Sequence, residues 1–271
     1  MELEIYQVDS FTSEPFKGNP AGVCITSDGL SNSLMLSIAE EMAVSETAFL
    51  SLSDMVLRWF TPKVEVKLCG HGTLAVAHVL KQRGHLDTGD RVEFSTLSGK
   101  LAALINESSI ELDFPSPIIE LDDSPSAVLL DNLGIKQTQV VAFGCFDSKT
   151  FIEVDNEETL LLLQPNFEAL KQKNGRGVLV TACSASNELD FVSRYFAPWV
   201  GVNEDPVTGS AHCALCVYWS KKLNKLKLKG YQASARGGFV QTELMPNGRT
   251  KLVGSAVTVL KGTMHVPNGS V

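Results

Sequence analysis

The sequence predicts an α+β protein of two similar lobes, each with one buried helix surrounded by many short strands. Residues 58–66 have an ungapped echo at residues 194–202, in which arginine, phenylalanine, proline and valine residues align. The offset, 194 − 58 = 136, is about half of the 271-residue chain. Each half also has a nearly all-apolar helical run, over 70–84 and 209–222. A helix that is apolar on every side is buried, so each lobe is expected to wrap a mixed, mostly antiparallel sheet or open barrel around it.

The echo resumes downstream at a larger offset, 209 − 70 = 139, so the second half carries three extra residues. The sequence places them between Val202 and Gly209. A repeat of half the chain length indicates two copies of one architecture. A segment rich in proline and serine (115–126) marks the boundary, which gives lobes over 1–115 and 116–271. A strand over about 260–271 is expected to cross back to the first lobe.

Composition excludes several classes of protein. The chain is 44% hydrophobic and 20% charged, with a net charge of −8, so we expect no nucleic-acid partner. The first residues do not form a secretion signal, and no apolar run is long enough to cross a membrane. The six cysteines have no framework spacing, which favours a reducing, cytoplasmic compartment.

In the first half, strands are predicted over 3–11 and 23–25, joined by a turn-rich segment. Ser31 or Ser33 can cap a helix that ends near Ala43. The other elements predicted in this half are strands over 44–50, 58–66 (with a proline turn), 94–104 and 109–114, and the buried helix over 70–84.

In the second half, a lysine-rich stretch at 221–229 is interpreted as the solvated end of the second buried helix running into a strand. The other predicted elements are helices over 127–132 and 157–171, strands over 140–146, 150–154, 178–182 and 190–196, a hairpin over 238–253 that turns at 246–249, and a closing strand over 255–266.

Glu46 is the first candidate catalytic residue. Strand parity puts it on the same face as Val44, Ala48 and Leu50. Burial of a carboxylate is costly unless it is paired or protonated, and desolvation raises its pKa toward the range useful for proton transfer. The alternative is an edge position at which Glu46 reaches water, and the residues alone favour that alternative.

Both buried helices begin with small residues, including Gly70, Gly72, Gly209 and Ser210. The first N–H groups of a helix have no partners within it, and the helix dipole favours an anion there. Two such sites facing each other would bind a carboxylate-bearing substrate. The alternative, equally supported, is that these residues only permit tight turns.

Asp205 lies beside the second helix start, in the segment with the extra residues. It pairs with Cys69 at one offset, whereas Thr208 pairs with Cys69 at the other, and the sequence does not decide between them. Asp205 is alternatively a helix cap. His71 is a candidate site residue, but the histidines do not show a metal-ligand spacing, so we expect no metal. Asn19 lies in a glycine-rich turn that either lines the site or only closes a hairpin.

Seven ordered motifs in both halves carry a family resemblance: Val8–Phe11, Gly18–Val23, Ser45–Phe49, Arg58–Pro62, Cys69–Ala75, Arg194–Pro198 and Glu204–His212. The chain resembles the phenazine-biosynthesis isomerase-like (PhzF) family, which has the diaminopimelate-epimerase-like fold. It looks most similar to the animal phenazine-biosynthesis-like domain-containing proteins. The resemblance implies a site in a cleft between the lobes, no cofactor, and a fold in which homodimers are common.

The resemblance also implies roles for single residues. It assigns proton transfer to Glu46, and a pocket lining to His71, Asp205 and Ser210. The substrate carboxylate would be bound by amides at the two helix starts. Racemases and epimerases with this fold use two cysteines, of which this chain keeps one candidate, Cys69.

We therefore expect a cofactor-independent isomerase that moves a proton on a small carboxylate-bearing substrate. The alternatives are an amino-acid racemase or epimerase that uses Cys69, and a partner-binding protein that retains the fold without catalysis.

Overall fold

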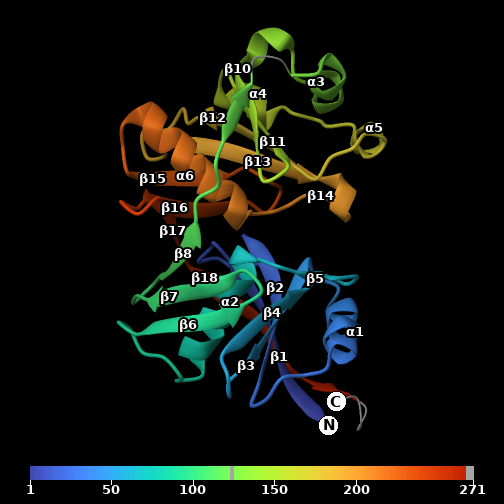
Figure 1. The fold of residues 1–271 in the computed structure, drawn as a ribbon, viewed down its shortest axis with the longest axis vertical. Coiled ribbons are helices and arrows are strands. Elements are labelled where there is room, and N and C mark those ends of the chain that lie inside the picture. The colour runs from blue at the N-terminus through green and yellow to red at the C-terminus, as the bar shows by residue number, and fades with distance from the viewer. Residues whose placement is uncertain (123–124, 267–271) are drawn as a thin grey trace. The chain divides into compact units, whose positions relative to one another are not determined.

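The computed structural model describes residues 1–122 and 125–266, and the chain divides into two compact units (Figure 1). Unit 1 comprises Met1–Phe114 and Val253–Val271, and unit 2 comprises Pro115–Leu252. Part of the predicted boundary segment (123–124) and the end of the predicted crossing strand (267–271) lie outside the described residues.

Unit 1 consists of a sheet, one helix that the sheet wraps and one outer helix. Its elements are β1 (Glu2–Ser10), β2 (Asn19–Thr26), α1 (Asn32–Met42), β3 (Glu46–Ser51), β4 (Val56–Phe60), β5 (Glu65–Val66), α2 (Gly70–Gln82), β6 (Arg91–Thr96), β7 (Gly99–Ile105), β8 (Ile110–Pro115) and β18 (Ala256–His265). The strands pair in the order β18, β1, β2, β3, β4, β6, β7 and β8. Only the pairs β2–β3 and β4–β6 of this series are parallel.

Unit 2 has the same plan. Its elements are β9 (Glu120–Asp122), α3 (Ala127–Leu133), β10 (Val140–Phe146), β11 (Lys149–Val154), α4 (Glu157–Leu161), α5 (Phe167–Lys171), β12 (Val178–Cys183), β13 (Phe191–Ala197), β14 (Val202–Glu204), α6 (Gly209–Leu223), β15 (Lys227–Gln232), β16 (Gly238–Leu244) and β17 (Arg249–Gly254), with 3₁₀ turns at Gln137–Gln139 and Pro198–Val200. The order β9, β10, β11, β12, β13, β15 and β16 repeats the unit 1 pattern, with β11–β12 and β13–β15 parallel.

The repeated sequence motif forms the same arginine–glutamate contact in each unit. Arg58 binds Glu65 through two hydrogen bonds of 2.7 Å and lies 5.1 Å from the centre of the Phe60 ring. Arg194 binds Glu204 through bonds of 2.7 and 2.9 Å and lies 4.9 Å from the Phe196 ring. In both units the arginine lies in one strand and the glutamate in the strand beside it, so the contact joins a strand pair.

This contact shows where the three extra residues of unit 2 lie. Phe60 pairs with Glu65 across the strands, and Phe196 pairs with Glu204. The two phenylalanines are separated by 136 residues, whereas the two glutamates are separated by 204 − 65 = 139 residues. The insertion therefore lies between Phe196 and Glu204, where unit 2 has the 3₁₀ turn Pro198–Val200. The predicted position after Val202 is wrong, because the valine echo there is coincidental.

With the insertion placed, the register at the buried helices is settled. At offset 139 Thr208 matches Cys69, and each is the N-cap residue of its helix. Ser210 then matches His71.

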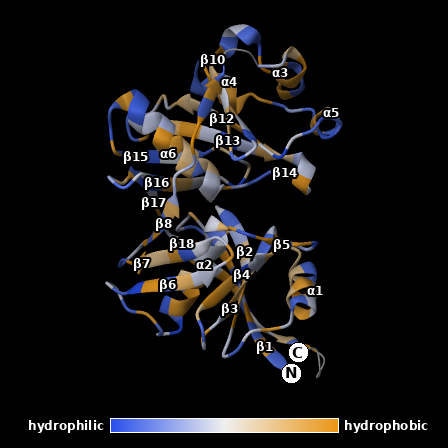
Figure 2. Ribbon diagram, in the orientation of Figure 1, coloured by the Kyte–Doolittle hydropathy of each residue, from blue (hydrophilic) through white to orange (hydrophobic). Residues whose placement is uncertain are grey.

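The predicted buried helices are α2 and α6. In α2 nearly every residue from His71 to Leu80 is buried, and the helix contacts β1, β2, β3, β7 and β18. In α6 the buried residues include Trp219, and the helix contacts β15 and β16. By contrast α1 is amphipathic: it buries Leu34, Met35, Ile38 and Ala39, and Figure 2 shows both hydrophobic and hydrophilic residues along it.

Two predicted elements are broken in the structure. The strand expected over 94–104 is parts of β6 and β7, joined by a tight turn in which Gly99 has φ +89°, a conformation that favours glycine. The helix expected over 157–171 is divided into α4 and α5, and Pro165 lies in the break because it cannot continue a helix. The short strands β9 and β14 were not predicted.

Candidate functional site

Glu46 begins β3, which lies between β2 and β4. The alternative of an edge position is therefore wrong, because β3 has a neighbour on each side. All other residues of β3 are buried, whereas the Glu46 side chain keeps 22% of its surface exposed. The carboxylate is thus half-enclosed but still reachable. Burial raises the pKa of the Glu46 carboxyl, and a hydrogen bond with Ser45 opposes part of that rise.

The buried imidazole of His71 lies between Glu46 and Asn19. It belongs to the first turn of α2, and its backbone carbonyl accepts a hydrogen bond of 2.8 Å from Ser10 Oγ. His71 Nε2 lies 3.4 Å from Glu46 Oε2 and 3.4 Å from Ser45 Oγ. His71 Nδ1 lies 3.3 Å from the side-chain nitrogen of Asn19. The structure therefore brings three predicted site residues, Glu46, His71 and Asn19, together in unit 1.

With the Asn19 amide in this orientation, its nitrogen donates and His71 Nδ1 accepts. In a neutral imidazole the proton then resides on Nε2, which faces the Glu46 carboxylate. His71 can thus donate to Glu46 when Glu46 is ionised.

Cys69 lies against the same histidine. Its Sγ is 3.6 Å from His71 Nδ1 and 3.8 Å from Nε2, and it accepts a hydrogen bond of 3.3 Å from the backbone N–H of Gly72. The ligand atoms of Glu46, Cys69 and His71 all lie within 4.8 Å of one another, close enough to hold a metal ion. The histidine spacing in the sequence did not reveal this group, because its other two members are a carboxylate and a thiol.

Gly72 is required by its surroundings. A Cβ at this position would lie 2.9 Å from Trp59 and 3.0 Å from Cys69 Sγ. Because Cys69 already accepts from the Gly72 N–H, a ligand at the start of α2 would have to compete with the thiol for that amide. Gly70 is the first residue of α2, directly after the Cys69 cap.

In unit 2, Asp205 precedes the N-cap of α6 rather than forming it. Thr208 is the N-cap residue, and its hydroxyl donates to Asp205 Oδ2. Gln232 fixes this segment: its amide nitrogen donates to the Asp205 carbonyl at 2.6 Å, and its Oε1 accepts from the Thr208 N–H at 2.9 Å. The alternative role of Asp205 as the helix cap is therefore wrong.

Ser210 follows Gly209 in the first turn of α6, and Lys149 Nζ donates to Ser210 Oγ at 2.9 Å. Lys149 is buried, and burial lowers the pKa of its amine, while Asp147 acts in the opposite direction. The sequence gave no reason to single out Lys149 or Gln232. Lys149 follows a turn and would be expected to reach water, and Gln232 ends a strand.

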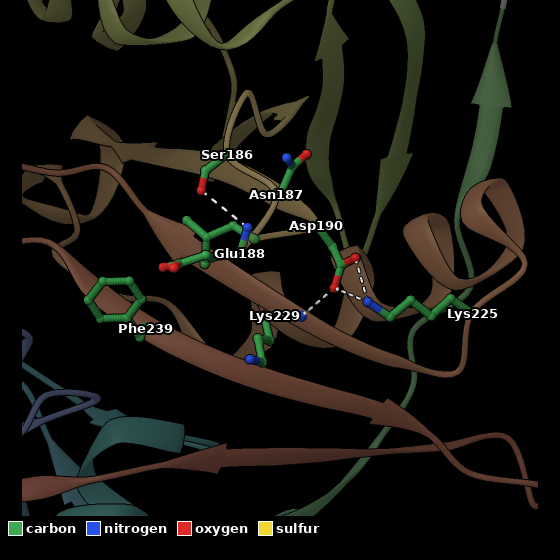
Figure 3. A pocket seen from close by; sticks show the side chains of 8 residues that line it. Ser186, Asn187, Glu188, Asp190, Lys225, Lys229 and Phe239 are labelled. Atoms are coloured by element: carbon green, nitrogen blue, oxygen red, sulfur yellow. Dashed lines mark hydrogen bonds and ion pairs between the residues drawn. The ribbon is translucent and has the colours of Figure 1, made fainter.

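A pocket on unit 2 is lined by none of these residues (Figure 3). It is lined mainly by polar side chains, among them Asp190, which binds Lys225 Nζ at 2.7 and 2.9 Å and accepts from the Lys229 N–H at 2.7 Å. Because Asp190 is already neutralised and no predicted site residue lines the pocket, we do not assign it to the candidate site. No helix among the described residues has the length and apolar character needed to cross a bilayer.

Comparison with known proteins identifies relatives along the whole chain. Residues 8–262 match the family model of phenazine biosynthesis-like proteins (PhzC-PhzF). A protein of Halalkalibacterium halodurans that is named an uncharacterized isomerase is 48% identical, over 97% of this chain and 99% of its own length. The phenazine biosynthesis-like domain-containing protein 1 of Mus musculus is 39% identical, over 97% and 99%. The bacterial relative is thus more similar than the mouse protein, although the motifs indicated the animal proteins first.

Solved structures agree. The crystal structure of a PhzF-family protein from Enterococcus faecalis has a TM-score of 0.90 and 39% identity, and the match covers 98% of this chain and 100% of that one. A probable proline racemase from Agrobacterium radiobacter has a TM-score of 0.63 at 12% identity, over 98% and 93%, which shows a shared fold alone. With its sequence matched over residues 8–262 and its fold matched along nearly its whole length, the chain belongs to the phenazine biosynthesis-like (PhzF) protein family.

Proposed function

We propose that the protein is a cofactor-independent isomerase in which Glu46 moves a proton on a small carboxylate-bearing substrate. Glu46 removes a proton from a carbon next to a carbonyl or unsaturated group and returns it elsewhere on the same molecule. The observation that carries this proposal is the raised pKa of a half-enclosed Glu46 held 3.4 Å from His71 Nε2. A carboxyl group with a pKa raised toward neutrality exchanges protons with carbon acids more readily than one with an ordinary pKa.

The supporting residues are placed to assist this step. His71 donates to the ionised carboxylate and its ring is held by Asn19. The start of α2 favours a negative charge through its dipole, which suits a substrate carboxylate. The name of the Halalkalibacterium relative, an isomerase, supports the same reaction class. Catalytic participation of Asp205 and carboxylate binding by Gly70, Gly209 and Ser210 stay predictions.

The test is hydrogen exchange in D₂O. A panel of small carboxylates with a C–H next to a carbonyl or double bond is incubated with the protein, and ¹H NMR measures loss of that C–H signal and formation of the isomer. We expect Glu46→Gln to lower the rate about 10²–10⁴-fold, the usual contribution of a general acid–base group. Glu41→Gln, an exposed change at the end of α1, is the matched control and retains the wild-type rate.

The pH profile provides a second readout. Only ionised Glu46 accepts a proton, so the wild-type rate falls as pH is lowered through the raised pKa of Glu46. Full activity in Glu46→Gln would show that Glu46 does not transfer the proton. Asp205→Asn keeps an acceptor for Thr208 and tests Asp205 separately. If Asp205 is catalytic, this variant is folded but slow.

A second candidate is racemisation or epimerisation through Cys69, which the 3.6 Å contact of Cys69 Sγ with His71 Nδ1 favours. Against it, the matching N-cap residue in unit 2 is Thr208, so the second unit has no thiol at that position. Loss of exchange at a substrate α-carbon in Cys69→Ala, with that exchange intact in Glu46→Gln, would select this candidate.

The remaining expectations concern assembly and partners. We propose a small anionic molecule as the ligand and a homodimer as the assembly. Sedimentation analysis measures the mass directly. Absence of any exchange across the carboxylate panel in a folded preparation would favour the partner-binding alternative.

A further inference from the structure

Cys69 is a buried thiol that the proposed proton transfer does not use. The residue is only 5% exposed, and it lies against His71 in the same group of side chains as Glu46. At the matching positions unit 2 has Thr208 in place of Cys69 and Ser210 in place of His71. The repeated framework therefore requires neither the thiol nor the imidazole. A carboxylate, an imidazole and a thiolate are the three kinds of protein ligand that bind zinc.

The distances between these three side chains fit a tetrahedral metal site. His71 Nε2 lies 3.4 Å from Glu46 Oε2 and 3.8 Å from Cys69 Sγ. Around a zinc ion, the edges of the tetrahedron are about 3.4 Å between nitrogen and oxygen and about 3.6 Å between nitrogen and sulfur. The two edges that meet at Nε2 therefore have nearly the required length. The three ligand atoms all lie within 4.8 Å of one another, so the third edge closes by a small movement of the side chains.

The backbone of unit 1 holds the three side chains in place. Cys69 is the N-cap residue of α2 and His71 lies in the first turn of the same helix, so their positions are coupled. Ser10 Oγ donates to the His71 carbonyl at 2.8 Å. The Gly72 N–H donates to Cys69 Sγ at 3.3 Å, a bond that a thiolate also accepts. Glu46 begins β3, which contacts α2, and its partly exposed side chain leaves a route by which an ion reaches the group.

Asn19 supports the histidine as a zinc ligand. With zinc on Nε2, the proton of a neutral imidazole resides on Nδ1, and this N–H needs an acceptor. His71 Nδ1 lies 3.3 Å from the side-chain amide of Asn19. Rotation of that amide by a half-turn exchanges its nitrogen and oxygen, so that its oxygen accepts from the Nδ1–H. Asn19 is completely buried, which keeps water from competing for this bond.

The choice of metal follows from the ligands. Thiolate and imidazole suit zinc, whereas magnesium, calcium and manganese prefer sets of oxygen ligands. Three protein ligands with a water molecule in the fourth position are a common arrangement around zinc. The donor set of unit 1 therefore favours zinc over the harder divalent ions.

We propose that Glu46, Cys69 and His71 form an inhibitory zinc site. Zinc is bound by Glu46 Oε2, Cys69 Sγ and His71 Nε2, and water completes the tetrahedron. The Glu46 oxygen then donates its electron pair to the metal and cannot take a proton from a substrate carbon. Isomerisation itself needs no metal. The binding of zinc is independent of the proposed function, whereas the inhibition rests on it.

Binding is tested on the full-length protein after treatment with EDTA, under reducing conditions. Cobalt(II) is titrated as a coloured substitute for zinc, because a tetrahedral cobalt site has visible absorption bands and a bound thiolate adds a near-ultraviolet charge-transfer band. Competition with a chromophoric chelator gives the zinc Kd. The main variant is Cys69→Ser, because serine removes the thiolate and is itself a preferred N-cap residue for α2. The control is Cys145→Ser, which changes an exposed thiol.

We expect the wild type and Cys145→Ser to bind zinc with the same Kd and to show both kinds of cobalt band. In Cys69→Ser the charge-transfer band should disappear. Its zinc Kd should rise about a hundredfold, since loss of a ligand costs at least as much as loss of a hydrogen bond to a ligand. Asn19→Leu removes only such a hydrogen bond, and its Kd should rise about tenfold.

Three results would overturn the site: no zinc binding by the wild type, an unchanged Kd in Cys69→Ser, or cobalt binding without the charge-transfer band. Glu46→Gln tests the third ligand, because the amide replaces the carboxylate, and an unchanged Kd in this variant would equally overturn the site. An unchanged Kd in Asn19→Leu would show that Asn19 does not orient the histidine.

Inhibition is tested by the exchange reaction in D₂O. With free zinc at about ten times its Kd, mass action leaves about a tenth of the protein without metal, so the wild-type rate should fall about tenfold and return when EDTA is added. Whatever rate Cys69→Ser retains should not fall at that zinc concentration. An unchanged wild-type rate with zinc bound would overturn the inhibitory role. If no carboxylate in the panel exchanges, the proposed function fails, and the cobalt spectrum still decides whether the metal site exists.

Discussion

The two units have the same framework and different chemistry. Each has the same order of parallel and antiparallel strand pairs and the same bidentate arginine–glutamate contact. Glu46 comes directly before Thr47, which pairs with Phe60. In unit 2, Gly177 comes directly before Val178, which pairs with Phe196, so Gly177 occupies the position of Glu46. The duplicated sequence therefore preserves the residues of the arginine–glutamate contact and not the residue at the position of Glu46.

The differing positions form two distinct sets. Unit 1 has an acid, an imidazole and a thiol at Glu46, His71 and Cys69. Unit 2 has the hydroxyl of Ser210 in place of the imidazole. It also has the amine of Lys149, which donates to Ser210, at the position that Ala21 occupies in the equivalent strand of unit 1. The two units therefore differ in chemistry at matched positions, and the proposed function uses the set in unit 1.

The largest expected effect is on the pH dependence of stability, when a residue of unit 2 is replaced by the matching residue of unit 1. Thr73 in α2 donates to the Cys69 carbonyl, and the matching His212 in α6 lies 2.9 Å from the Thr208 carbonyl. Burial lowers the pKa of His212 to about 4. Between pH 6.5, the ordinary pKa of a histidine, and pH 4 the unfolded chain binds a proton that the folded protein does not. Stability is therefore lost as pH falls through this window, by about 3 kcal/mol.

His212→Thr copies Thr73 and is expected to remove that pH dependence. Urea unfolding of the variant and the wild type at pH 7.5 and pH 4.5 measures how much unfolding free energy each protein loses between the two pH values. The exposed His265→Gln is the control. Equal pH dependence in wild type and His212→Thr would contradict the assignment.

A smaller effect is expected from adding a side chain where unit 1 has its acid. A Cβ at Gly177 would lie 2.0 Å from the Tyr195 hydroxyl, so Gly177→Ala should destabilise the protein by about 2 kcal/mol through overpacking. Gly29→Ala, which meets no atom within 4 Å, is the matched control in chemical denaturation. Tyr195→Phe in the Gly177→Ala background should recover part of the loss. If Tyr195→Phe recovers none of the lost stability, contact with the Tyr195 hydroxyl is not the reason why a side chain at position 177 destabilises the protein.

The two arginine contacts should differ in strength. The Arg194 side chain is 13% exposed and also donates to the Leu163 carbonyl at 2.8 Å, whereas Arg58 is 24% exposed and donates to Asn32. We expect Arg194→Met to cost about 2 kcal/mol of unfolding free energy and Arg58→Met about 1 kcal/mol. Denaturant titration of both variants compares them directly, and the reverse ranking would show that burial does not set the difference.

The smallest expected effect is that of metal removal. Proton transfer requires the Glu46 carboxylate to be free of a metal ion, so prolonged treatment with EDTA should leave the exchange rate in D₂O unchanged. A loss that zinc restores would instead show that Glu46, Cys69 and His71 hold a metal that the reaction needs.

Periodicity and repetition predicted the two buried helices and most strands, because apolar patterning reflects burial directly. The insertion was misplaced, because aligned valines are common in strands, whereas the contact of Glu204 with Arg194 depends on pairing that a sequence does not display. Glu46 was identified, but its flanking by β2 and β4 was not, since residues alone do not distinguish an edge strand from a central one. Lys149 was missed because a lysine beside a turn is usually solvated.

The assignment of β18 to unit 1 affects the order in which the protein can assemble. Its partner β1 is at the start of the chain, and all of unit 2 lies between them in sequence. During translation unit 2 leaves the ribosome as one continuous piece, whereas β1 has no partner on one side until β18 has been made. Unit 2 can therefore mature on the nascent chain, and the sheet that contains Glu46 is completed last.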